Sequence, residues 1–483
     1  MQNRLLRILT SSAVSVALAG CMVGPNYHRP SLPLTPAFKE QGWAPVQPAD
    51  LTPRGDWWTV FNDPALSALE AKVAISNQNV AAAEAAYRQA QALVREQRAG
   101  LFPTVSLDGG ATRSGGGRGS SGTIVTGPGG TGVVSGGGGR SSTSYRASVS
   151  ASWVPDIWGR IRRGIEAARG SAQASDADLA AARLSAQGTL ATDYFDLRET
   201  DIEIALLTQA VAGYQKSLAI TQNRFNAGIA PHSDVLQAQT QLASTQGDLT
   251  DLSRTRAAFE HAIAVLDGQT PETFALAADP SWQPIVPGVP AAVPSSLLQR
   301  RPDVAAAERR AASASAQIGV EVAAYFPDLT LSGSYGFAAT ELGKLFSTTN
   351  SVWSYGASVT ETVFNGGLTG ARVSAARAGY DQAVAQYRQT VLAALQNVED
   401  QLAATRVLAQ EYAYRDEAAR DADLAATMVL NQYREGQVAY TNVVTAQVAA
   451  LNARRTLVQQ AASRQAAEVA LIQGLGGGWT APF

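Results

Sequence analysis

Residues 223–239 read NRFNAGIAPHSDVLQAQ, and residues 431–447 read NQYREGQVAYTNVVTAQ. Both stretches carry an aromatic residue, a glycine three positions later, Ser/Thr followed by Asp/Asn, then Val, and finally Ala-Gln. Two further pairs of similar stretches occur in the same order along the chain, residues 101–107 with 325–331 and residues 145–149 with 355–359. Three matched pairs in one order indicate that the chain contains two copies of one structural unit.

Each copy contains long segments that are rich in Ala, Gln and Leu and free of proline, a composition typical of helices. The predicted helices cover residues 65–99, 164–223, 235–266, 304–323, 368–433 and 443–475. Residues 164–223 alone would form a helix about 90 Å long, far longer than the helices of a globular core. Apolar residues recur at coiled-coil spacing within 235–266, namely Leu242, Leu249, Leu252, Phe259, Ile263 and Leu266. The sequence therefore predicts long helical hairpins.

Between the helices lie segments in which apolar and polar residues alternate, as in strands with one apolar and one polar face. They form two predicted hairpins, over residues 103–154 and 328–364. The pattern fits membrane-barrel strands, and it also fits an antiparallel sheet packed on a soluble core. Four strands cannot close a membrane barrel, so several chains would have to share one. Two chains would supply eight strands and three chains twelve.

The N-terminus resembles a bacterial lipoprotein signal. Arg4 and Arg7 precede a short apolar run that ends in LAGC at residues 18–21. The run is too short for a permanent membrane-spanning helix, and no later stretch approaches 18 uninterrupted apolar residues. We expect cleavage before Cys21 and a covalent lipid on this residue, the alternative being an ordinary signal with an incidental cysteine. Met22 is not the aspartate associated with inner-membrane retention, which indicates the outer membrane.

Composition excludes several classes of function. The 483 residues include 38 Lys and Arg against 40 Asp and Glu, and the formal net charge of -2 gives no reason to expect nucleic acid as a partner. The single cysteine permits no disulfide within the chain. His28, His232 and His261 lack the spacing of metal ligands, and the adjacent Ser233 and Asp234 are no evidence for a catalytic triad. We therefore expect no enzyme activity, no metal and no cofactor.

The expected organisation follows from these segments. A signal peptide (1–20) precedes an extended segment (21–63), a first repeat (64–270), a Pro-rich linker (271–300), a second repeat (301–478) and a short tail (479–483). Residues 109–144, rich in Gly, Ser and Thr, are predicted to be a flexible loop outside the cell. The Pro-rich stretches 25–53 and 271–294 are predicted to be extended linkers that wrap the helices.

Two short motifs have predicted structural roles. Arg301-Pro302-Asp303 is predicted to start a helix, because proline suits the first turn and aspartate complements the helix dipole. An apolar latch is predicted before the first helix, formed by Trp57, Trp58, Phe61 and Pro64.

Four ordered motifs resemble a known family. They are DWWTVFNDPAL at 56–66, PSSLLQRRPDV at 294–304 with Glu308, IGV at 318–320 leading to Phe326-Pro327, and LGGGW at 475–479. They are similar to the outer membrane factors, the TolC- and OprM-like family, and within it to the NodT-type lipoproteins. The resemblance runs from Cys21 to the C-terminus. It implies a homotrimer with a shared twelve-stranded barrel in outer membrane lipid and a helical tunnel in the periplasm. The trimer would be the passive exit duct of a tripartite efflux pump, with a periplasmic adaptor (membrane fusion) protein and an inner-membrane RND or other pump as partners.

The duplicated turns are the candidate functional site. Gly228 and Gly436 are predicted to end helices in the left-handed conformation, and Ser233-Asp234 and Thr441-Asn442 are predicted to be N-caps of the returning helices. The resemblance implies that the tips dock on the adaptor, through Arg224, Phe225, Gly228, Ser233, Asp234, Tyr433, Gly436, Thr441 and Asn442. It also implies a periplasmic gate formed by Asp234, Gln237, Asn442 and Thr445. The second copy departs from an acidic gate, and helix capping alone would also explain Asp234 and Asn442.

Alternative functions remain open from the sequence. A type I protein-secretion duct would share the same architecture. A trimeric surface adhesin or structural stalk would also combine coiled coils with a shared barrel, although such a protein normally carries its barrel at one end of the chain. A cell-wall enzyme would need paired catalytic groups that the sequence does not show. The exported compound is not defined by the sequence.

Overall fold

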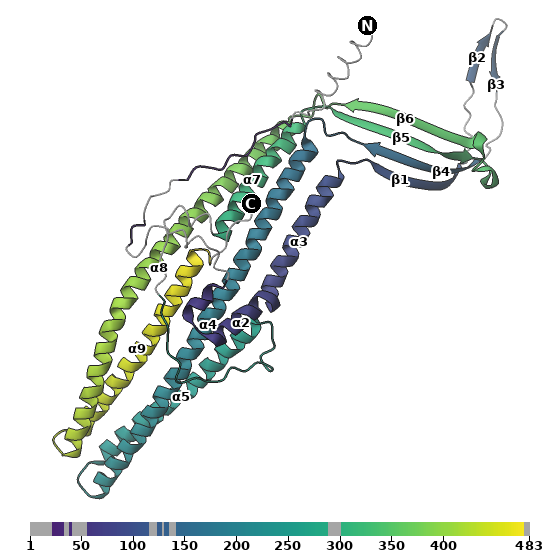
Figure 1. Cartoon of the computed structure of the whole chain (residues 1–483). Helices are drawn as coiled ribbons and strands as arrows, with labels where there is room; N and C mark the ends of the chain where they lie inside the picture. The colour runs from purple at the N-terminus through teal and green to yellow at the C-terminus, as the bar shows by residue number, and fades with distance from the viewer. Residues whose placement is uncertain are drawn as a thin grey trace. The chain divides into compact units, whose positions relative to one another are not determined.

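The computed structural model describes residues 22–32, 38–40, 56–114, 123–127, 130–134, 142–287 and 301–477 (Figure 1). The predicted signal peptide, Cys21 and the tail at 479–483 lie outside these residues. The chain forms two compact units, the first comprising Met1–Tyr27, Ala92–Arg169 and Ser313–Tyr380, and the second His28–Gln91, Gly170–Ala312 and Asp381–Phe483.

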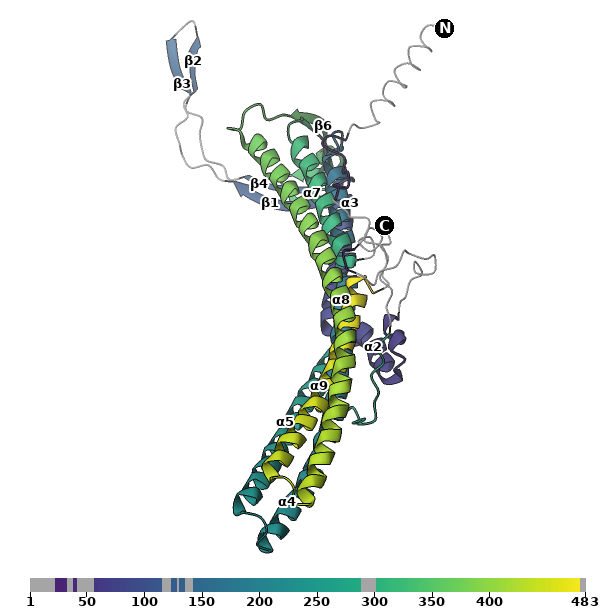
Figure 2. The ribbon, with the colours of Figure 1, turned by 90° about the vertical axis from the view of Figure 1, so that its left-hand side faces the viewer.

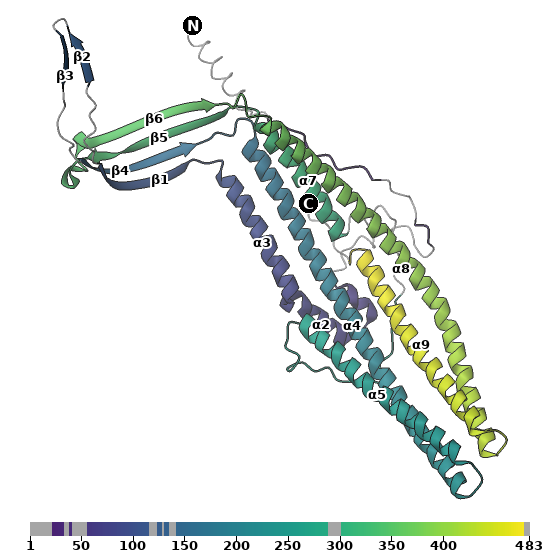
Figure 3. The same cartoon turned by 180° about the vertical axis from the view of Figure 1, so that it is seen from behind.

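The helices confirm the duplication. The first copy contains α3 (Gln78–Ala99, 22 residues), α4 (Arg160–Asn226, 67 residues) and α5 (His232–Leu266, 35 residues). The second contains α7 (Pro302–Ala323, 22 residues), α8 (Leu368–Arg434, 67 residues) and α9 (Tyr440–Gly474, 35 residues). At 1.5 Å per residue α4 and α8 are each about 100 Å long. Figures 1 and 3 show α5 returning along α4, and α9 returning along α8.

The first unit contains a four-stranded antiparallel sheet in the order β1-β4-β5-β6. Its strands are β1 (Thr104–Ser114), β4 (Ser142–Trp153), β5 (Asp328–Ala339) and β6 (Ser351–Thr360). Short 3-10 turns, Leu342–Lys344 and Thr348–Asn350, connect β5 to β6. The two predicted hairpins are present as β1-β4 and β5-β6, and β4 pairs with β5 to join them.

The strand register places the apolar side chains on one face of this sheet. Val149 of β4 is opposite Leu107 of β1 and Tyr335 of β5, and Tyr335 is in turn opposite Trp353 of β6. Opposed residues share a face, because side chains alternate between faces along each strand. The other face carries serines, and two opposed hydroxyl pairs across it are 2.7 and 2.9 Å apart. The predicted alternation is therefore confirmed.

The prediction of a flexible loop over 109–144 is wrong for a large part of that segment. Residues 109–114 continue β1, and their backbone pairs with β4 down to Ser114 opposite Ser142. Further along the loop, β2 (Thr123–Gly127) and β3 (Gly130–Val134) pair with each other in a separate two-stranded sheet. Strand pairing uses backbone groups, which Gly and Ser supply as well as larger residues do, so their abundance did not prevent strands.

The predicted helix over 65–99 is two helices. α2 (Pro64–Ser76) ends before Asn77, whose backbone is extended, and α3 begins at Gln78. The Asn77 carboxamide oxygen accepts hydrogen bonds from the backbone N–H groups of Asn79 and Val80, and its amide donates to the carbonyl of Leu266. Asn77 therefore acts as the N-cap of α3 and ties the break to the end of α5.

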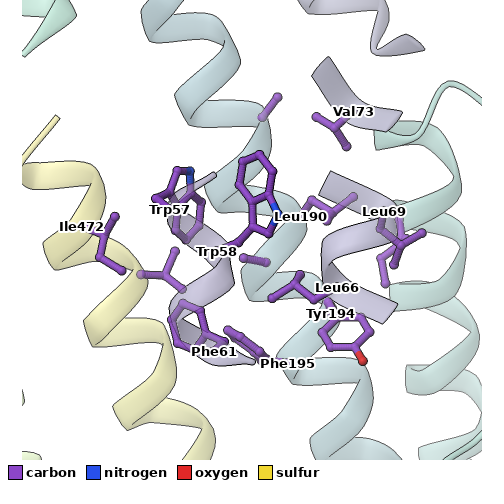
Figure 4. Packing of buried hydrophobic residues seen from close by; sticks show 14 of the residues in the cluster. Trp57, Trp58, Phe61, Leu66, Leu69, Val73, Leu190, Tyr194, Phe195 and Ile472 are labelled. Carbon is purple, nitrogen blue, oxygen red and sulfur yellow. The ribbon is translucent and has the colours of Figure 1, made fainter. Parts of the chain in front are cut away.

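The predicted apolar latch is confirmed in the second unit (Figure 4). Trp57, Trp58 and Phe61 lie in a 3-10 turn (Trp57–Phe61) and are buried with residues of α2, α4 and α9. Pro64 is the first residue of α2, and the Asp63 carboxylate accepts hydrogen bonds from the first-turn amides of this helix. The second Asp63 oxygen accepts from the Tyr194 hydroxyl at 2.8 Å and the Trp282 indole at 3.0 Å. One carboxylate thus joins the latch to α4 and to the linker.

The other structural predictions concern the linkers and the start of α7. Pro302 is the first residue of α7 as predicted, and Arg301 pairs with Asp303 while donating to the Gly474 carbonyl at the end of α9. Described residues 25–32, 38–40 and 271–287 contain neither helix nor strand. Phe38 is buried against α8. Among the described residues, no helix is both long enough and apolar enough to cross a membrane.

Candidate functional site: the two helical tips

Figure 2 shows the two tips of the second unit, where α4 is followed by α5 and α8 by α9. Both tips end their first helix in the same way. Gly228 and Gly436 have φ values of 72° and 76°, which confirms the predicted left-handed conformation. Gly228 N–H donates to the Phe225 carbonyl and Ile229 N–H to the Arg224 carbonyl, and the second tip repeats both bonds from Gly436 and Gln437. This bond pair is the Schellman motif, which satisfies the last carbonyls of a helix.

The predicted N-caps of the returning helices are wrong. Pro231 and Ala439 occupy the N-cap positions of α5 and α9, and neither helix has a side-chain cap bond. Ser233, Asp234, Thr441 and Asn442 lie inside the first turn. The Asp234 and Asn442 amides instead donate to the backbone carbonyls of the N-cap residues. These two amides are therefore satisfied by the backbone and not by a side-chain cap.

An aromatic pair closes each tip across its turn. Phe225 and His232 have ring centroids 5.1 Å apart, and at the equivalent positions of the second tip Tyr433 and Tyr440 are 5.3 Å apart. The tyrosine pair is buried with Ala238 and Val443, whereas Phe225 is exposed. Burial raises the pKa of Tyr440 to about 12. The spacing of seven residues between aromatics in both copies was a sequence signal for these pairs.

Arg224 connects the two tips. Its guanidinium donates to the backbone carbonyls of Tyr433 at 3.1 Å and Arg434 at 3.3 Å, and it lies 4.8 Å from the centre of the Tyr433 ring. These carbonyls belong to the last turn of α8, where a cation is also favoured by the helix dipole. The position equivalent to Arg224 in the second copy is Gln432, so no equivalent arginine of the second tip can contact the end of α4. An arginine at this position in only one of the two duplicated turns was the sequence signal for this contact, but the contact was not predicted.

Of the candidate gate residues, Asp234 and Asn442 lie in the first turns of α5 and α9, and Gln237 and Thr445 lie in the second turns. Gln237, Asn442 and Thr445 are exposed, and Asp234 is half-buried. Partial burial raises the pKa of the Asp234 carboxyl and the Arg224 charge lowers it, with a net shift upward. The Thr441 hydroxyl lies 3.4 Å from the Gln237 carboxamide oxygen, so the starts of α9 and α5 are in contact. The structure thus groups Asp234 and Gln237 with Arg224 and Thr441, in the second unit.

Comparison with known proteins identifies the chain. The family model for outer membrane efflux proteins matches residues 70–269 and 293–477, one match for each copy of the duplicated unit. The chain belongs to the outer membrane efflux protein family. The outer-membrane channel OprN has a similar structure, with a TM-score of 0.84 and 30% identity over 95% of this chain and 100% of that one.

Curated relatives span nearly the whole chain. The cation efflux system protein CusC of Escherichia coli O6:H1 is 26% identical over 96% of this chain and 97% of its own length. The pyoverdine export outer membrane protein OpmQ of Pseudomonas putida is 29% identical, over 97% of each chain. This outer membrane efflux protein is therefore a channel of the outer membrane, as the sequence motifs predicted.

Proposed function

We propose that three copies of this efflux protein form a passive exit duct of a tripartite pump, with a shared barrel of twelve strands. The observation that carries this proposal is the four-stranded sheet. Among the described strands, β1 and β6 each have one edge without a partner, and an exposed edge is a template for pairing with another chain. Four strands per chain close only when chains combine, and three chains give twelve strands.

The two faces of the sheet support a barrel in lipid. Leu107, Val359 and Tyr355 are 80%, 67% and 82% exposed on the apolar face, which in water would be a costly surface. The opposite face carries paired serine hydroxyls and suits a water-filled lumen. Aromatic residues lie toward both ends of the apolar face, with Trp153 at one end and Phe337 and Tyr145 toward the other. Such aromatic girdles are typical of the two membrane interfaces.

The tips are the proposed contact with a periplasmic adaptor, and Asp234, Gln237, Asn442 and Thr445 the proposed gate. The first tip carries exposed Phe225 and Ile229, and a Schellman turn ends the first helix at each tip. An inner-membrane pump would supply the energy, because the chain carries no nucleotide-binding motif. CusC and OpmQ are named for a cation and for pyoverdine, so relatives of similar identity serve different compounds. We propose that the pump selects the exported compound, and that the duct has no enzymatic function and no cofactor.

The proposed membrane anchor is a covalent lipid on Cys21, attached when the signal peptide is cleaved. The barrel would hold the protein in the membrane independently of this lipid. Replacing Cys21 by serine removes lipid attachment, and the strands keep the trimer in the outer membrane. Metabolic labelling with palmitate measures the first effect directly. Undiminished label on the Cys21→Ser protein would contradict lipid attachment at this residue.

The duct itself is tested by conductance and by export. The purified protein should run as a trimer on a mild gel and conduct ions in a planar bilayer, and a strain without the gene should become sensitive to small toxic compounds. Loss of a secreted protein, with normal sensitivity to small compounds, would instead indicate a protein-secretion duct. A trimer without conductance would contradict the proposal and favour a stalk or adhesin.

A further inference from the structure

The first unit contains a buried arginine that the proposed duct does not use. Arg163, in the first turn of α4, is 1% exposed although it is charged. Its guanidinium donates to the carbonyls of Val23 and Gly24, each at 3.1 Å, and to the Asn26 side-chain oxygen at 2.9 Å. The remaining partner is the Glu166 carboxylate at 2.7 Å. Three of the four acceptors are therefore supplied by the N-terminal segment.

Glycines shape the same place for that segment. Gly24 has a φ of 92°, and a Cβ on it would lie 2.5 Å from the Gly319 Cα of α7. A Cβ on Gly319 would lie 2.8 Å from the Arg163 Cδ, and a Cβ on Gly159, with a φ of 82°, would lie 2.6 Å from the Met22 Cγ. The chain passes so closely here that no larger residue fits without movement.

A backbone bond fixes the start of the segment to the protein. Val23 N–H donates to the Trp158 carbonyl at 3.1 Å. Trp158 stacks on Phe326 with ring centroids 4.8 Å apart and donates from its indole to the Pro327 carbonyl. Pro327 directly precedes β5, so the docked segment is tied to the base of the sheet within one compact unit.

We propose that Arg163, Gly159 and Gly319 form a docking site for the chain's own segment Met22–Asn26, and that this site positions the lipid-bearing end of the mature protein. Met22 directly follows Cys21, so the proposal rests on the lipid attachment proposed above. Undocking the segment would remove three of the four acceptors of Arg163 and leave the Glu166 carboxylate, so the charge-assisted hydrogen bonds favour the docked state. Docking therefore fixes the point at which the acyl chains leave the protein, beside the base of β5.

Hydrogen exchange tests the docking directly. Gly24→Ala in the full chain adds a methyl group against the Gly319 backbone while keeping the Arg163 side chain in the protein. We expect the Val23 amide to exchange at least about tenfold faster in this variant and in Arg163→Ala. The matched controls are Gly379→Ala, where a Cβ meets nothing within 4 Å, and Arg160→Ala, where the arginine is exposed. Exchange at the wild-type rate in Gly24→Ala would overturn the docking site.

A double-mutant cycle tests the positioning role. We expect Gly24→Ala to lower the yield of trimer in the outer membrane while leaving palmitate labelling intact, and to have no further effect in a Cys21→Ser background. An equal loss in both backgrounds, or no loss in either, would overturn positioning of the lipid. Absent palmitate label on the wild-type protein would instead contradict lipid attachment, and the exchange measurement would still judge the docking site.

Discussion

Replacing Arg224 by alanine should release the second tip from the first. The substitution removes two hydrogen bonds to the carbonyls of Tyr433 and Arg434 and the contact with the Tyr433 ring. The hydrogen bonds involve a charged donor in a half-buried setting, and together with the ring contact they contribute about 2 kcal/mol. At 1.4 kcal/mol for each factor of ten, the equilibrium ratio of molecules with the two tips in contact to molecules with the tips separated falls about thirtyfold.

Hydrogen exchange at the second tip measures this change. The amides of Glu435, Gly436 and Gln437 donate to carbonyls of the last turn of α8, and we expect them to exchange about thirtyfold faster in Arg224→Ala. Arg434→Ala is the matched control, because the Arg434 side chain donates to Asn431 of its own helix while its backbone carbonyl stays in place to accept from Arg224. If the proposed gate is correct, Arg224→Ala also opens more often in a planar bilayer. Equal exchange rates in Arg224→Ala and Arg434→Ala would refute the argument.

Three further predictions follow from the turns, the buried carboxyl and the loop. Gly228→Val or Gly436→Val should destabilise its tip by roughly 1 kcal/mol or more, because a β-branched residue fits a positive φ poorly. Each variant should reach the outer membrane as a trimer but lose export and crosslinking to the adaptor. Wild-type export in both variants would contradict the tips as the adaptor contact. Burial raises the pKa of Glu70 from 4.5 to about 9, so between these pH values the folded chain keeps a proton that the unfolded chain releases. The free energy of unfolding should therefore fall as the pH rises through this range. Urea unfolding of Glu70→Gln should lack this pH dependence. Deleting residues 115–140 removes β2 and β3, which pair only with each other among the described strands, so trimers should persist on a mild gel; their loss would show that this segment is a packed element.

Periodicity and duplication predicted most of the architecture. Helix-forming composition fixed the long elements to within a few residues, and strand alternation predicted which side chains share a face. The pairing of β4 with β5 was not predicted, because residues far apart in sequence must meet for it to form. The break between α2 and α3 at Asn77 was not predicted, because it depends partly on a residue far away in sequence. The Asn77 side-chain amide donates a hydrogen bond to the Leu266 carbonyl.

The candidate site was predicted less completely. Glycine spacing located both turns and their left-handed residues, since a positive φ is a local property. The N-caps were misplaced because Ser and Thr are favoured both at the cap and within the first turn's polar face. The burial of Glu70 was not predicted, although this residue shares a helix face with the buried Leu66, Leu69 and Val73. The contact of Arg224 with α8 depends on how two hairpins pack, which one hairpin's sequence does not specify.

The open edges of β1 and β6 have a consequence for biogenesis. In hydrocarbon, unpaired backbone groups cost several kcal/mol each, so on the proposed trimer a lone chain cannot insert and then wait for partners. Insertion and oligomerisation become a single event whose rate depends steeply on chain concentration. A chain with a damaged β1 edge and an intact β6 edge would still recruit a neighbour and block ring closure. Such alleles should be dominant negative, whereas alleles that damage both edges should be recessive.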